Sequence, residues 1–162
     1  MPEIIGWQKS LVVQKDMSLG CIPTGYEFLI RVSGIEGVDL STFQDEFNLQ
    51  ARNIDNNSFD SVANAVEQKY QDIKIDRKAF PTGREKVDFV KDLLEQGKPC
   101  LLSLIISKGN YHIMPVIYID DSIMITIHHM ESSGIIQLLR LDLRDVIYRH
   151  DNYSGGNDVA WL

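Results

Sequence analysis

The sequence has few cysteines, no long apolar run, no basic tract and no internal repeat. Its two cysteines, among 162 residues, cannot form a disulfide framework. Every apolar run is much shorter than the roughly 20 residues that a membrane-spanning helix needs. The net charge of −7 argues against nucleic acid or an anionic membrane as the main partner. We therefore expect a function that involves no membrane and no nucleic acid.

What the chain does contain is typical of a single soluble domain over residues 1–162. Hydrophobic residues make up 44% of the sequence and charged residues 24%, so an ordinary core can form without disulfide bonds. The beginning of the chain lacks the basic residues and long apolar core of a secretory signal, so we expect a cytoplasmic protein. No exposed heptad or dimerisation helix is visible, and we expect a monomer.

Helical periodicity fills the first part of the chain, and strand-like runs fill the second. Apolar spacing, two capping boxes (residues 41–44 and 82–85) and glycine or proline stops predict four helices, at 21–32, 42–52, 59–70 and from Thr82 to Gly97. Strands are predicted at 100–106, 111–119, 122–128, 135–141 and 159–162, with a short helix at 142–150. A helical part of about 1–98 before an antiparallel sheet at about 99–162 indicates an α+β fold.

A cysteine stands at the start of the first predicted helix. Cys21 follows Gly20 and precedes Pro23, which is tolerated in a first turn. Unpaired N–H groups and the positive end of the helix dipole favour a thiolate there, so we expect a reactive thiol with a lowered pKa. Cys100 lies inside an apolar run, where a buried and inert side chain is expected. A Cys21–Cys100 disulfide is the less favoured alternative.

Two other residue types could complete a thiol site. His112 precedes the apolar run 113–119 at a strand start, and it is the candidate general base for Cys21. Gln14 lies shortly before Cys21. Its side-chain N–H and the backbone N–H of Cys21 are candidate donors to the oxyanion that forms when a carbonyl is attacked. Gln8 is the weaker candidate for the same role.

The residue that orients His112 depends on the pairing of the predicted hairpin. If residues 120–121 form a two-residue turn, His112 faces His129. A two-residue slip places Glu131 opposite His112 instead, and a one-residue slip offers His128. The predicted orienting residue is therefore His129, with Glu131 as the alternative.

A metal centre is the less favoured interpretation of the histidines. His128 and His129 are adjacent, so in a strand they face opposite sides of the sheet and cannot readily share an ion. Without a second Cys or His at ligand spacing we expect no metal, and no glycine-rich phosphate loop indicates another cofactor.

The order of these residues resembles papain-like cysteine peptidases. Gln14, the Gly20-Cys21-Ile22-Pro23-Thr24 helix start and His112 on a later strand are most similar to the compact branch of double-glycine-leader (bacteriocin-processing) peptidase domains. The resemblance covers the element order of nearly the whole chain. It implies a papain-like fold in which Cys21 is the nucleophile, His112 the base and Gln14 the oxyanion donor. Where that family has Asp-Pro or Asn-Pro, this chain has His-His-Met-Glu at 128–131.

Two classes of function follow from these observations. The first is a cysteine-dependent hydrolase that cleaves peptide or amide bonds of a peptide or protein substrate through an acyl-enzyme. Acyl transfer and deamidation use the same groups with a different acceptor or leaving group. The second is a catalytically inactive papain-like module that binds peptides or proteins, which the unusual segment at 128–131 motivates.

Overall fold

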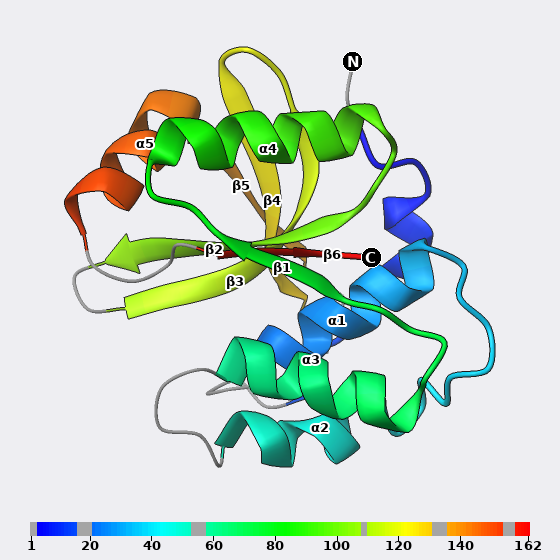
Figure 1. Cartoon of the computed structure of the whole chain (residues 1–162). Helices are drawn as coiled ribbons and strands as arrows, with labels where there is room; N and C mark the ends of the chain where they lie inside the picture. The colour runs from blue at the N-terminus through cyan, green and yellow to red at the C-terminus, as the bar shows by residue number, and fades with distance from the viewer. Residues whose placement is uncertain (1–2, 16–20, 53–57, 108–109, 131–135, 154–157) are drawn as a thin grey trace.

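The computed structural model describes residues 3–15, 21–52, 58–107, 110–130, 136–153 and 158–162 (Figure 1). Its helices are η1 (Trp7–Ser10), α1 (Cys21–Val32), α2 (Phe43–Arg52), α3 (Ser58–Lys69), α4 (Gly83–Glu95) and α5 (Leu143–Asn152). Its strands are β1 (Asp76–Ala79), β2 (Cys100–Ser107), β3 (Asn110–Ile119), β4 (Ile123–Met130), β5 (Ile136–Asp142) and β6 (Asp158–Trp161). The prediction of an α+β fold is confirmed.

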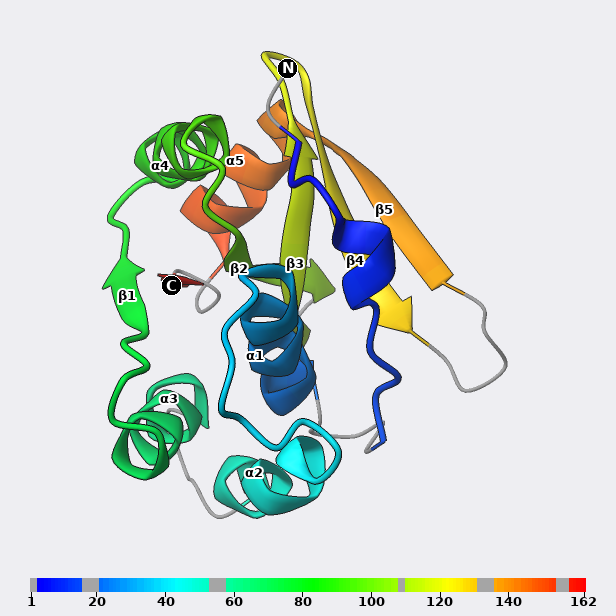
Figure 2. The ribbon, with the colours of Figure 1, turned by 90° about the vertical axis from the view of Figure 1, so that its right-hand side faces the viewer.

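The strands form an antiparallel sheet with helices on both faces. The strand order is β1-β6-β2-β3-β4-β5. Helices α1, α2 and α3 lie on one face, and α4 and α5 lie on the other (Figures 1 and 2). Along β2, Leu101 packs into the core beneath α1, whereas Leu102 packs into the core beneath α4. A strand that is covered on both faces buries side chains of either parity, which explains why β2 is a continuous apolar run.

The predicted helices and the five predicted strands form within one or two residues of their expected ends, and two short elements were not predicted. The Thr82 cap is present, because its hydroxyl accepts from the Glu85 N–H (3.2 Å). The unpredicted elements are η1 and β1. β1 has the sequence Asp-Arg-Lys-Ala, which has no apolar alternation, and it forms by pairing with β6 at the edge of the sheet.

The predicted turn of the β3–β4 hairpin is wrong by one residue. Asp120 still pairs, since its N–H donates to the Ile123 carbonyl (3.0 Å). Its Oδ1 accepts from the N–H groups of Ser122 (2.7 Å) and Ile123 (2.8 Å), so the side chain closes the turn. Ile119 consequently pairs with Met124.

The described pairing of β3 with β4 ends before the histidines. A bulge just after Val116 shifts the register again, and the last described pair on this side joins Val116 and Thr126. The ladder ends at Val116, and the residue before it, Pro115, has no N–H to donate. The predicted pairing of His112 with His129 is therefore wrong within the described ladder.

Helix α1 approaches the sheet closely at Gly25. A Cβ atom at this position would lie 2.9 Å from both terminal methyl carbons of Leu101 on β2. The missing side chain thus allows the first turns of α1, including Cys21, to lie directly against the central strands. Among the described residues, no helix combines the length and the apolar character that crossing a bilayer requires.

Candidate active site

The N-terminal segment and the start of α1 meet two strands from much later in the sequence, β3 and β4, at a pocket on the α1 face. The pocket is partly open to solvent, and the centre of a water molecule can occupy about 10 Å³ within it. It is lined by Gln14 of the N-terminal segment, Cys21, Thr24 and Gly25 of α1, His112, Ile113 and Pro115 of β3, and Ile127 and His128 of β4. The fold thus brings Cys21, His112 and Gln14 together. Gln8 is exposed in η1 and does not line the pocket.

Cys21 is the first residue of α1 and is half-buried. Burial raises its pKa above the ordinary value of 9.0, although hydrogen-bonding contacts from the backbone N–H groups of Ile113, Cys21 and Ile22 lower it in part. The expectation of a lowered pKa is therefore wrong for the protein without substrate, because desolvation outweighs the helix start. The backbone N–H group that lowers this pKa most belongs to Ile113, the residue that directly follows His112.

His112 lies where β3 and β4 have stopped pairing, and its ring contacts β4. Its Nε2 is 2.9 Å from the carbonyl oxygen of His128. A carbonyl oxygen only accepts, so Nε2 carries the proton, and Nδ1 of the neutral ring is left as the basic nitrogen. The rings of His112 and His128 meet edge to face, with centroids 5.0 Å apart. A backbone carbonyl thus orients the imidazole.

A bulge in β4 accounts for the position of His128. Ile127 pairs with Leu138 and His129 pairs with Gln137, so His128 is the extra residue between two ladder pairs. Neighbours in a regular strand face opposite sides, but Ile127 and His128 both line the pocket. In the sequence, His128 is a candidate only if the hairpin register slips by one residue, because a bulge leaves no periodic signal. The side chain of His129 and the whole of Glu131 lie outside the described residues.

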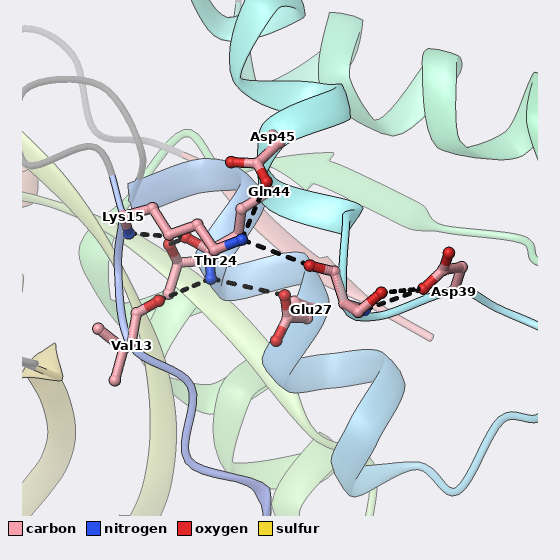
Figure 3. A network of polar contacts seen from close by, with 8 residues as sticks. Val13, Lys15, Thr24, Glu27, Asp39, Gln44 and Asp45 are labelled. Atoms are coloured by element: carbon pink, nitrogen blue, oxygen red, sulfur yellow. Dashed lines mark hydrogen bonds and ion pairs between the residues drawn. The ribbon is translucent and has the colours of Figure 1, made fainter.

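Gln14 is buried, with 8% of its surface exposed. The residues before and after it, Val13 and Lys15, both form hydrogen bonds with the side chain of Gln44. The Nε2 of Gln44 donates to the Val13 carbonyl (2.7 Å), and the Oε1 of Gln44 accepts from the Lys15 N–H (2.9 Å) (Figure 3). The capping-box interpretation of residues 41–44 is therefore wrong for Gln44, although the predicted helix forms. No local pattern could have revealed these partners, because they lie about 30 residues away.

The second cysteine, Cys100, lies away from this pocket. Neither Cys21 nor Cys100 forms a disulfide bond. Cys100 is fully buried on the α4 face, as predicted, and burial raises its pKa to about 12. Within the described ranges, no group of three or more His, Cys, Asp or Glu side chains could hold a metal ion.

Comparison with protein families and curated proteins identified no relative of this chain. No protein-family model matches the chain, and no curated protein matches it either.

Proposed function

We propose that this protein is a cysteine-dependent hydrolase of peptide or amide bonds with a papain-like fold. The observation that carries the proposal is the pocket that Cys21, His112 and Gln14 line together. A nucleophile, a base beside it and an amide donor are the three groups that acyl-enzyme chemistry needs.

The first half-reaction forms a thioester. The Cys21 sulfur attacks the substrate carbonyl carbon while Nδ1 of His112 takes the thiol proton. The carbonyl oxygen becomes an oxyanion, which the side-chain N–H of Gln14 and the backbone N–H of Cys21 stabilise. The C–N bond then breaks, and the leaving amine takes the proton from His112.

The second half-reaction releases the acyl group. His112 removes a proton from water, the hydroxide oxygen attacks the thioester carbonyl, and the C–S bond breaks to give a carboxylic acid. The sulfur recovers the proton from His112. With an amine or alcohol in place of water the same residues catalyse acyl transfer, and with a side-chain amide as substrate they catalyse deamidation.

The raised pKa of Cys21 favours general-base catalysis over a resting thiolate–imidazolium pair. Burial keeps the thiol protonated in the free protein, so the proton moves to His112 as the sulfur attacks. The contact between Nε2 and the His128 carbonyl supports this role, because it keeps Nδ1 free of the proton in the neutral ring.

Alkylation by iodoacetamide over a range of pH tests this proposal. At pH 7 we expect Cys21 to react at least about tenfold faster in the native protein than in His112→Ala, because the base assists only while the thiol is protonated. Above the pKa of the thiol the two rates should converge, since a thiolate needs no base. Equal rates at pH 7, or a difference that persists at high pH, would contradict a base role for His112.

A peptide-binding module without catalysis is the second candidate. The burial that raises the Cys21 pKa is the observation in its favour. It predicts that Cys21→Ala leaves peptide or protein binding unchanged, and that 4-nitrophenyl acetate is hydrolysed equally by the native protein and Cys21→Ala. The hydrolase proposal predicts that Cys21→Ala abolishes ester cleavage above the background rate.

A further inference from the structure

Gln44 uses every hydrogen-bonding position of its side-chain amide. It is 2% exposed, and besides Val13 and Lys15 it contacts two side chains of α1. Its Oε1 accepts from the Thr24 hydroxyl (3.0 Å), and its Nε2 donates to the Glu27 carboxylate (3.5 Å) (Figure 3). A primary amide has two acceptor sites and two donors, so all four are used.

The contacts with Val13 and Lys15 imitate the pairing of parallel strands. In a parallel ladder, one residue accepts from the N–H of residue i+1 of its neighbour and donates to the carbonyl of residue i−1. The Gln44 amide makes this pair of bonds on either side of Gln14. Two bonds that bracket a residue fix its backbone orientation, and the direction of its side chain follows from the backbone.

The other two contacts join the same amide to the helix that carries the nucleophile. Thr24 lies one turn after Cys21 and also lines the pocket. Glu27 is held in turn by Arg31 (2.8 Å). One buried side chain therefore connects the segment that bears Gln14 to the helix that begins at Cys21.

We infer that Gln44 is a positioning residue that fixes the position and direction of the Gln14 side-chain amide relative to the Cys21 sulfur. The inference rests on the proposed function, because it gives Gln14 the role of oxyanion donor. Gln44 itself does not line the pocket, so it acts through Gln14. A displacement of about 1 Å at an oriented catalytic group can cost on the order of a hundredfold in rate.

Two reactions of the same thiol separate positioning from general structural support. Alkylation by iodoacetamide displaces iodide and forms no oxyanion, whereas acylation by 4-nitrophenyl acetate passes through a tetrahedral oxyanion. We expect Gln44→Met to lower the rate constant for acylation of Cys21 by about tenfold or more. The release of 4-nitrophenolate measures this rate constant. Its alkylation rate should stay within about twofold of the native rate. Gln68→Met, which replaces an exposed amide on α3, is the matched control and should change neither reaction.

A double-mutant comparison sharpens the test. Gln14→Ala alone should lower acylation by about a hundredfold. Adding Gln44→Met to it should cause little further loss, because the group that Gln44 positions is already gone. A loss that multiplies in the double mutant, unchanged acylation in Gln44→Met, or an equal loss of both reactions would overturn the inference.

A second variant keeps the test decisive if Gln44→Met does not fold. Gln44→Glu retains the shape of the side chain and the oxygen facing Lys15 and Thr24, but an oxygen replaces the Nε2 that donates to the Val13 carbonyl and to the Glu27 carboxylate. The same separation of the two reactions is expected, and equal loss of both overturns the inference. Failure of the proposed function looks different, since native Cys21 would then be acylated no faster than an ordinary thiol and the thioester would not turn over.

Discussion

The two faces of the sheet each carry one cysteine, but only one face gives its cysteine access to solvent. On the α1 face, Cys21 is half-buried at a pocket that also contains His112 and Gln14. On the α4 face, Cys100 is completely buried between the sheet and the helices, where burial raises its pKa to about 12. The same side chain is thus a candidate nucleophile on one face and a small apolar residue on the other.

The α4 face buries ionisable side chains as well. Lys86 is fully buried and donates to the Ser103 carbonyl, and the Nε2 of His150 donates to the Phe80 carbonyl (3.0 Å). Burial lowers the pKa of Lys86 to about 7, and burial followed by the charge of Lys86 lowers the pKa of His150. These shifts come from a closed core, so a shifted pKa alone does not identify a functional region here. Access for a reactant distinguishes the α1 face.

The reactivity of the two thiols should show the largest difference. In the native protein at pH 8 we expect Cys100 to be alkylated at least about a thousandfold more slowly than Cys21, because its reaction requires an unfolding event. Mass spectrometry of labelled peptides at successive times measures both rates. In guanidinium chloride the two rates should become similar. Comparable rates in the folded state would remove the contrast between the faces.

The buried lysine should make stability depend on pH. The folded pKa of Lys86 is about 7 and its ordinary value is 10.5, so between these values the unfolded chain binds more protons. The unfolding free energy should therefore rise as the pH increases from about 7 to 10.5, by up to on the order of 1.4 kcal/mol per pH unit. Nearby Asp158 opposes part of the shift. In urea titrations, the unfolding free energy of Lys86→Met should rise less with pH than that of the native protein. An equal rise would contradict the proposal that Lys86 is neutral in the folded state and charged in the unfolded state.

One substitution made on both faces compares their packing. A Cβ at Gly83 would lie 2.7 Å from the Cα of Ile147 on α5, whereas at Gly25 it meets only the flexible end of Leu101. We expect Gly83→Ala to lower the unfolding free energy by about 2 kcal/mol or more, since backbone must move. Gly25→Ala should cost about 1 kcal/mol or less, because alanine also favours the helix. Thermal or urea unfolding measures both, and the reverse order would contradict the packing described.

The smallest effect is expected at the outer edge of the Gln44 network. Lys15 forms an ion pair with Asp45 (3.0 Å), and both side chains are exposed. Lys15→Ala should change the unfolding free energy by about 0.5 kcal/mol or less at 0.15 M salt, because such pairs are screened and mobile. A decrease in the unfolding free energy of more than about 2 kcal/mol would contradict the expectation that the Lys15–Asp45 pair contributes little to stability.

Much of the fold could be predicted because it depends on neighbours along the chain. The Thr82 cap and the start of α1 at Cys21 come from local patterns, as does the burial of Cys100. The hairpin register could not be predicted. The Asp120 side chain accepts from two backbone N–H groups and places the turn one residue later than predicted. A bulge after Val116 then shifts the register of β3 and β4 again. Neither feature changes the apolar periodicity of the sequence.

Apart from η1 and β1, the sequence by itself determined the kinds of elements and their order. It also determined that a cysteine stands at a helix start and a histidine near a strand start. Only the tertiary structure decided how those groups behave. Burial at the pocket reversed the expected pKa shift of Cys21. The His128 carbonyl contacts the His112 ring, and the Gln44 side chain binds the backbone on either side of Gln14. Periodicity and capping depend on residues a few positions apart, whereas desolvation and long-range hydrogen bonds depend on atoms that become neighbours only when the chain folds.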